Sequence, residues 1–351
     1  MANTQRLVVV LVAALGLAGC SLVGASGSDT SDGTVTLVTH DSFGIGEDIL
    51  AQFTAETGLA VQVVTLGDAG SMVNQLVLTR GAPLGDVVFG VDTTFATRAL
   101  DEGVIAPAPR LSAPALADAQ AHALAGDDGR LVAIDYGDVC VNADLVWFAE
   151  RGVDPPTTLE DLLAEQYRGL LVTPSPVTSS PGFAFLLATI AATGEQWPTY
   201  WADLDANGVQ VAAGWSDAYA SAFTAGGGNG DRPLVVSYDT SPPYTIPDGG
   251  TEPTTAALLG TCFRQTEYAG VLAGAKNPDG AALLVDFLLS DTVQQVVATT
   301  MYMYPVSTSV TLPAEWVAWA PLADEPFAVD PATITANREQ WLNTWADLGV
   351  G

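Results

Sequence analysis

The chain has 351 residues, of which 48% are hydrophobic and 15% are charged, and its formal net charge is -29. This composition is globular with ample material for a core, and the length suggests two domains. Because 40 Asp and Glu face only 11 Lys and Arg, nucleic acids and anionic membrane surfaces are poor partners. The acidity is typical of a surface that keeps a protein soluble in a salty exterior, and it is also compatible with a cationic ligand.

Residues 1–19 have the pattern of a signal peptide. Arg6 is the only charge before an apolar run that is too short to span a membrane as a permanent helix. The run ends in Leu-Ala-Gly before Cys20, and these small residues resemble the signal of bacterial lipoproteins, which implies a lipid on the Cys20 thiol. Residues 20–33 are small, polar and rich in Gly and Ser, which predicts a flexible tether. The alternative is an ordinary signal peptide with an incidental cysteine.

Strand, turn and helix alternate three times after the tether. The expected strands are Thr34–Thr39, Ala60–Leu66 and Asp86–Val91, and the expected helices include Glu47–Thr57 and Met72–Thr79. This pattern predicts an α/β fold with a mainly parallel sheet, in which ligands bind beyond the carboxyl ends of the strands. Polar residues stand at those ends: His40, Asp41 and Ser42, then Asp68, Ala69 and Ser71, then Asp92 and Thr93. Each turn alone is explained by helix capping, but three turns on one edge predict a shared cleft.

The middle of the chain is predicted to form a second domain. Leu131–Asp144 is extended and predicts the crossing into it, and Thr261–Gly270 predicts the return. Expected strands are Leu170–Val172, Val209–Ala212 and Leu234–Tyr238, and expected helices are Thr158–Glu165, Phe183–Thr193, Trp197–Leu204 and Asp217–Phe223. Helices are also expected over Ala281–Leu289, Thr292–Thr299 and Ala336–Leu348. In the last of these, Trp341 and Trp345 are one turn apart, which is typical of core packing.

Aromatic and small polar residues gather between Gly214 and Tyr244. This stretch holds four aromatic residues among Ser, Asp and Thr side chains: Trp215, Tyr219, Tyr238 and Tyr244. Pro242 and Pro243 prevent the preceding strand from continuing. Rings supply stacking area and hydroxyls or carboxylates supply orientation, as a small, flat, polar ligand requires. The alternative is a set of core aromatics beside an ordinary Pro-rich turn.

Other candidate sites are few. Cys140 and Cys262 remain after Cys20, and an exported compartment favours a disulfide between them, with two separate buried thiols as the alternative. The only histidines are His40 and His122, and no G-x-S-x-G or H-E-x-x-H motif occurs, so no metal site and no cofactor is predicted. Ser179 and Ser180 precede a helix whose backbone N–H groups suit an anion or a polar ligand group, or are simply capped. A carboxylate-based hydrolase stays open, although nothing singles out a pair of acids.

Eight motifs in order resemble the bacterial thiamine-binding proteins, the substrate-binding components of ABC importers. They are THDSFG at 39–44, GDAGS at 67–71, VFGVD at 88–92, IDYGD at 134–138, TSSPG at 178–182, GWSDAY at 214–219, VVSYDTSPPY at 235–244 and MYPV at 303–306. GWSDAY together with SYDTSPPY is the specific part. The resemblance implies a two-lobed periplasmic-binding-protein fold of type II, with lobe 1 formed by 34–135 and 263–351 and lobe 2 by 136–262, which closes on the ligand.

The resemblance also implies which residues meet the ligand. They are Asp68, Ala69, Ser179, Ser180, Trp215, Tyr238, Asp239, Thr240, Ser241 and Pro242, with Tyr244 and the turn of His40, Asp41 and Ser42 as neighbours. His40 replaces a tyrosine that is familiar in the family, which alters one stacking surface. Asp239 replaces a neutral hydroxyl residue, and its added charge would disfavour phosphorylated thiamine. On the same picture the two crossing strands lie side by side, so a bridge between Cys140 and Cys262 is expected at the hinge.

The expected function is therefore a non-catalytic, monomeric receptor outside the cytoplasm, anchored through Cys20, which delivers thiamine to an ABC permease. Thiamine is a permanent cation with two flat rings, so Trp215 and the tyrosines can stack on it and Asp68 can balance its charge. One alternative is a receptor for iron or another metal ion. A second is an exported thiamine-degrading enzyme, which would need Cys140 or Cys262 as a free nucleophile.

Overall fold

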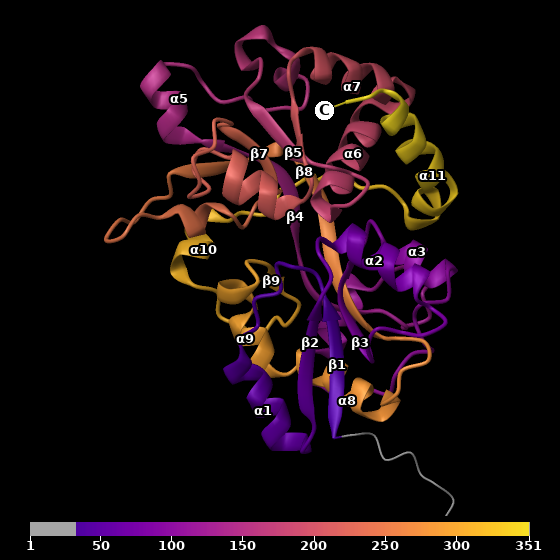
Figure 1. Ribbon diagram of the computed structural model, residues 1–351. Coiled ribbons are helices and arrows are strands. Elements are labelled where there is room, and N and C mark those ends of the chain that lie inside the picture. Colours follow the sequence, from indigo (N-terminus) through magenta and orange to yellow (C-terminus); the bar gives the residue numbers. More distant parts are fainter. Residues whose placement is uncertain (1–32, 351) are drawn as a thin grey trace, which may run out of the picture. The chain divides into compact units, whose positions relative to one another are not determined.

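Two long antiparallel strands, β4 (Val132–Asp144) and β8 (Thr255–Val271), run through the middle of the fold. The structure, a computed structural model, describes residues 33–350. Over this range nine strands form one mixed sheet in the order β2-β1-β3-β8-β4-β7-β5-β6, with β9 (Tyr304–Pro305) paired to β4. In Figure 1, β4 and β8 connect the indigo and purple elements below to the magenta and salmon elements above.

The lower group contains the predicted strand–helix repeats. Its strands are β1 (Thr34–Thr39), β2 (Ala60–Thr65) and β3 (Val87–Asp92), and its helices are α1 (Glu47–Thr57), α2 (Ala69–Leu78) and α3 (Ala96–Asp101). β1 pairs in parallel with both β2 and β3, as the sequence predicts, and β3 pairs antiparallel with β8. Every residue of β3 is buried, because helices and neighbouring strands cover it.

The upper group is built in a similar way. Its strands are β5 (Leu171–Pro174), β6 (Gln210–Ala212) and β7 (Leu234–Tyr238), and its helices are α5 (Leu145–Arg151), α6 (Ser180–Thr193) and α7 (Trp197–Ala206). β5 is parallel to β6 and β7, and β7 is antiparallel to β4. The first ten residues of α6 are all buried, which matches its nearly continuous apolar sequence.

The remaining helices follow β3 and β8. They are α4 (Leu116–Ala119), α8 (Pro278–Leu288), α9 (Asp291–Thr300), α10 (Ala314–Trp319) and α11 (Pro331–Asp347). α11 contacts both α3 and α7, so it spans the two groups, as the yellow helix in Figure 1 shows. Its Trp345 is buried with its ring 5.7 Å from that of Trp201, which confirms the predicted core role of Trp345.

Some predicted boundaries are wrong. The helix expected over Thr158–Glu165 is replaced by two 3-10 turns, Asp161–Leu163 and Glu165–Tyr167, because Asp161 accepts hydrogen bonds from two preceding N–H groups and closes the chain into a turn. The segment Asp217–Ala222 is a π-helix. β8 begins six residues before the predicted Thr261. α11 begins at Pro331 rather than at Ala336, because Asp330 caps it and Pro331 suits its first position.

Cys140 on β4 and Cys262 on β8 form a disulfide, which confirms the predicted pairing. Both residues are buried between the two central strands. Within residues 33–350 no single helix is long and apolar enough to cross a membrane; α8 and α9 pass that test only as a pair, bent by 65° at the break. The predicted signal peptide, Cys20 and nearly all of the tether lie outside the described residues.

We predict that reducing the disulfide destabilises the protein without preventing folding. The bridge closes a loop across a sequence separation of 122 residues, and closing a loop of that length is worth about 4–5 kcal/mol in the chain-entropy estimate. Denaturant unfolding of the oxidised and reduced protein measures the difference. In a Cys140→Ala, Cys262→Ala variant the reductant should have no effect. Two thiols that react with a maleimide in the unfolded, non-reduced protein would contradict the bridge.

Candidate functional site

A cavity of about 380 Å³ lies where the turns after β1 and β7, the start of α2 and α6, and the loop after α9 meet. This volume is within the range of small-molecule sites. Most of the predicted site residues line it: His40, Asp41, Ser42, Asp68, Ala69, Ser180, Trp215, Tyr238, Ser241 and Tyr244. Residues far apart in the sequence therefore share one cavity, as two of the three polar turns indicate. The third turn was predicted wrongly, because Asp92 is buried and neither it nor Thr93 lines the cavity.

One wall of the cavity consists of three aromatic rings. The Trp215 ring stacks on Tyr219, with the centroids 5.1 Å apart and the planes at 18°, and it meets the Tyr238 ring edge-on at 6.4 Å. The indole N–H donates to the Ser237 hydroxyl at 2.9 Å, which fixes the orientation of the ring. Tyr219 was not among the predicted site residues. It belongs to the same GWSDAY motif as Trp215, so the motif could have identified it. This wall offers a flat surface on which a ring can stack.

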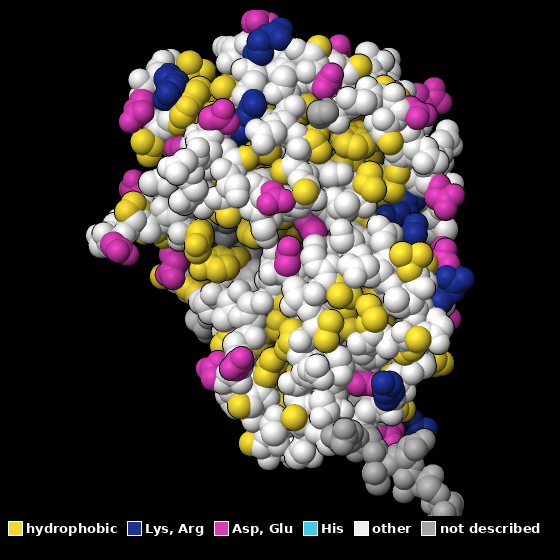
Figure 2. Space-filling view, viewed as in Figure 1, with side chains coloured by type: hydrophobic (Ala, Val, Ile, Leu, Met, Phe, Trp, Pro, Cys, Tyr) yellow, Lys and Arg dark blue, Asp and Glu magenta, His cyan; other side chains and the backbone are white. Residues whose placement is uncertain are grey.

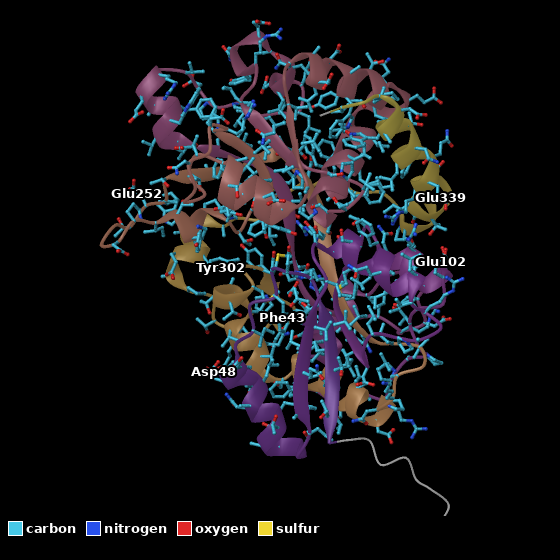
Figure 3. The ribbon with its side chains drawn as sticks, in the orientation of Figure 1. Phe43, Asp48, Glu102, Glu252, Tyr302 and Glu339 are labelled. Carbon is cyan, nitrogen blue, oxygen red and sulfur yellow. A yellow bond between two sulfur atoms is a disulfide. The ribbon has the colours of Figure 1, made fainter. Side chains whose placement is uncertain are left out.

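Tyr244 and Tyr302 form a second aromatic corner. Their rings meet edge-to-face at 5.2 Å, and Tyr244 is 59% exposed. Tyr302, labelled in Figure 3 beside the loop that follows α9, adopts a positive φ of 53°, which is uncommon for a bulky residue. The Thr240 hydroxyl donates to the Tyr302 carbonyl, and such contacts hold the strained residue in place.

Four predicted residues do not line the cavity. The Ser179 hydroxyl caps α6 by accepting a hydrogen bond from the Gly182 N–H. The Thr240 hydroxyl donates a hydrogen bond to the Tyr302 carbonyl. Pro242 is buried at the start of a 3-10 turn. Asp239 is buried with its Oδ1 accepting from the Asp138 N–H, and burial raises its pKa well above 3.8. Its predicted extra charge therefore does not line the cavity.

Asp68 joins segments from the lower and upper groups. Its Oδ1 accepts from the N–H of Ala69 at 2.7 Å and of Ser180 at 3.2 Å, and its Oδ2 accepts from the Trp215 N–H at 2.9 Å. Burial raises the pKa of Asp68, and these hydrogen bonds partly offset the rise. The Ser180 N–H at the start of α6, which the sequence suggested could bind an anion, thus donates to the Asp68 carboxylate of the protein itself.

His40 occupies the turn after β1 in a buried position. The Ser42 N–H donates to its Nδ1 at 3.1 Å, and its Nε2 lies 3.5 Å from a carboxylate oxygen of Glu267. Gly90 makes room for the ring, because a Cβ at that position would lie 2.1 Å from the His40 Cδ2. Burial lowers the pKa of His40, but the charge and hydrogen bond of Glu267 outweigh it, so the pKa is raised.

Glu267 is the main cavity residue that the sequence did not identify. It stands within β8, in the middle of the predicted return strand, and no motif marks it. Only the register of β8 against its neighbours turns its side chain into the cavity. Met301 and Met303 were also missed, although the MYPV motif pointed to their loop.

The cavity is acidic. Its charged lining residues are Asp41, Asp68 and Glu267 together with His40, and no Lys or Arg of residues 33–350 lines it. In Figure 2 the charged side chains near the middle of the visible face are acidic, whereas the Lys and Arg side chains lie toward its upper and right-hand parts. No three His, Cys, Asp or Glu side chains in the described range are placed to hold a metal ion.

Comparisons with known proteins agree with this arrangement. The profile of the family described as bacterial extracellular solute-binding protein matches residues 48–324. The chain is 30% identical over 334 residues to the thiamine-binding periplasmic protein of Brucella suis biovar 1 (strain 1330), covering 93% of this chain and 95% of that protein. It is 22% identical over 326 residues to iron uptake protein A1 of Synechocystis sp. (strain ATCC 27184 / PCC 6803 / Kazusa), covering 88% and 87%.

The fold is also that of solved relatives. A structure titled periplasmic thiamin binding protein matches with a TM-score of 0.78 and 27% identity, covering 90% of this chain and 96% of that one. The predicted periplasmic-binding-protein fold is thereby confirmed.

We predict that the unliganded protein is more stable at about pH 5 than at about pH 8. Burial raises the pKa of Asp92 from 3.8 to about 6, so the folded state binds that proton more tightly and stability falls as the pH rises through this interval. The raised pKa of His40 acts in the same direction, since its stabilisation is lost as the pH rises above its folded-state pKa. We expect a Tm higher by roughly 5 °C at the lower pH.

The Asp92→Asn variant should show a weaker dependence of Tm on pH, because it removes one of these protons. Glu252→Gln, an exposed change (Figure 3), is the matched control and should keep the wild-type dependence. A Tm that rises between pH 5 and pH 8 would contradict the role of the buried acids.

Proposed function

The chain belongs to the bacterial extracellular solute-binding proteins, a non-enzymatic family of ABC-type transport, and we propose that it captures thiamine and delivers it to an ABC permease. The observation that carries the proposal is an acidic cavity walled by Trp215, Tyr219 and Tyr238. The similarity to thiamine-binding proteins over most of the chain supports the same ligand.

The chemistry of the cavity suits thiamine. A cation over an aromatic face gains about 0.5–2 kcal/mol, and Trp215 and the tyrosines offer such faces. Since micromolar binding needs roughly 8 kcal/mol, hydrogen bonds accepted by the Ser180 and Ser241 oxygens, and those of the tyrosine hydroxyls, must add to stacking. Thiamine phosphates bring negative charge toward Asp41, Asp68 and Glu267, so the unphosphorylated vitamin is the preferred form.

We further propose that the protein works by closing two lobes around the ligand. Residues 34–135 and 263–351 form one lobe, residues 136–262 form the other, and β4 and β8 bend between them. Asp68 supports this idea, because it belongs to the first lobe and accepts N–H groups of Ser180 and Trp215 from the second. Opening would break both hydrogen bonds, so this carboxylate stabilises the closed form.

The two alternatives predict different chemistry. An iron receptor would coordinate a bare ion, whereas these walls offer stacking area for an organic ring. A thiamine-degrading enzyme would need a free cysteine, but Cys140 and Cys262 are bonded to each other. The organic cation is therefore the better-supported ligand.

For location, we propose that the mature protein is a monomer held at the outer face of the cell membrane by a lipid on Cys20. The sequence Leu-Ala-Gly before Cys20 supports this anchor. Metabolic labelling with a fatty-acid analogue should mark the wild-type protein and leave a Cys20→Ala variant unmarked. Labelling of the variant at the same level would overturn the anchor.

Calorimetry of residues 33–351 should show that thiamine binds more tightly than its mono- and diphosphate, with no binding of Fe(III). Trp215→Ala and Tyr244→Ala should each weaken thiamine binding, the first by at least about tenfold, because they remove stacking area. Tyr244→Ala should leave the Tm nearly unchanged, since that side chain is largely exposed.

Trp147→Ala is the matched control, because Trp147 is also partly buried but lies outside the cavity, against Arg151. It should leave the affinity for thiamine unchanged. Equal affinity of the wild type and both cavity variants, or tight Fe(III) binding, would overturn the proposal.

A further inference from the structure

Three acidic side chains form a row across neighbouring strands beneath the cavity. In the sheet register Glu267 on β8 stands opposite Asp92 on β3 and also opposite Asp135 on β4. Residues directly opposite in an antiparallel pair point to the same face of the sheet. All three are buried, with Asp92 and Asp135 at 0% exposure and Glu267 at 5%. Like charges in such a row repel, so the fold must neutralise them or match them with a cation.

Hydrogen bonds stabilise one outer member of the row, Asp92, and a raised pKa favours the neutral form of the other, Asp135. Asp92 accepts from the Thr94 hydroxyl at 2.9 Å, from the Phe95 N–H at 3.2 Å and from the Ser180 hydroxyl. Burial, and then the charge of Glu267, raise the pKa of Asp135 well above 3.8, which favours its neutral form. Neither residue lines the cavity.

Glu267 differs from both because its side chain lines the cavity. The one charged partner that it has in the described chain is His40, whose Nε2 is 3.5 Å from the Glu267 carboxylate. A titratable imidazole is a weak and removable partner compared with a Lys or Arg. The other cavity acids are less available, since Asp68 already accepts three N–H groups and Asp41 is exposed to solvent.

We propose that Glu267 is the specificity-determining counter-ion for a positively charged ligand ring, and that His40 competes with the ligand for this carboxylate. The inference rests on the proposed function for the identity of the ring, the thiazolium of thiamine. The low dielectric of the aromatic walls strengthens the attraction between the carboxylate and the ring. Its two neighbours in the row, Asp92 and Asp135, are themselves acids and supply no positive charge that could pair with Glu267.

The competition has a direct consequence for protons. The titratable groups that face His40 are Glu267 from β8, Asp68 at the start of α2 and the adjacent Asp41. All are acids that favour its charged form. A ligand cation beside Glu267 therefore expels the His40 proton, and affinity rises as the pH rises through the pKa of His40.

The test compares thiamine with an isostere in which a neutral thiophene ring replaces the thiazolium. The wild type should prefer thiamine by at least about tenfold, and Glu267→Gln should lose this preference while its affinity for the isostere changes little. Glu267→Asp should keep the preference with weaker binding, because it keeps the charge at a greater distance. Glu252→Gln is the matched exposed control and should behave like the wild type.

The outcomes separate the two levels of the proposal. If wild-type protein binds neither compound, the proposed function fails. If it binds thiamine and Glu267→Gln weakens both compounds equally, Glu267 is only structural and the counter-ion role is overturned.

Calorimetry of the wild type in buffers of different ionisation enthalpy provides a readout that needs no foldable Glu267 variant. Thiamine should release protons near the pKa of His40, and His40→Gln should abolish the release. Binding without proton release, and with an affinity independent of pH, would overturn the competition.

Discussion

The antiparallel pairing of β4 with β8 determines where the other parts of this molecule lie. It places Cys140 beside Cys262 and so connects the outgoing and returning crossings of the chain. It also sets Glu267 opposite Asp135 and turns the Glu267 carboxylate into the cavity. A slip of one residue would move every side chain of β8 to the other face of the sheet, so the Glu267 carboxylate would leave the cavity.

The same register creates an electrostatic cost. Buried acids opposite one another destabilise the folded protein unless protons or hydrogen bonds compensate them. Asp92 accepts hydrogen bonds from the Thr94 and Ser180 hydroxyls, and the raised pKa of Asp135 favours its neutral form. Glu267 keeps only a histidine as its charged partner in the described chain. An incompletely matched buried charge lowers the stability of the fold, a cost that is common at functional sites. A bound cation would recover part of that stability.

Much of the fold could be predicted from the sequence because its signals are local. Apolar runs and turn residues located β1, β3, β7 and most helices, and the aromatic motif located Trp215, Tyr238 and Tyr244 in one cavity. The misses involve longer-range physics. Glu267 enters the cavity only through cross-strand register, and Asp239 leaves it because its carboxylate turns toward the Asp138 N–H. Neither position can be predicted from residue type or spacing. Sequence reasoning favours an acid in a turn as a ligand-binding residue, and it does not favour an acid within a strand.

Asp68 shows how one residue can satisfy both the capping and the ligand-binding interpretation of a polar turn. It caps α2 through the Ala69 N–H. The same carboxylate also accepts hydrogen bonds from the backbone N–H groups of Ser180 and Trp215, two other residues that line the cavity. Those two N–H groups reach it only when the segments that carry the aromatic wall lie against the start of α2. The hydrogen bonds that hold Asp68 in place therefore also set the position of Trp215, which lines the cavity. The position of the stacking surface and the contact between these segments thus depend on the same hydrogen bonds.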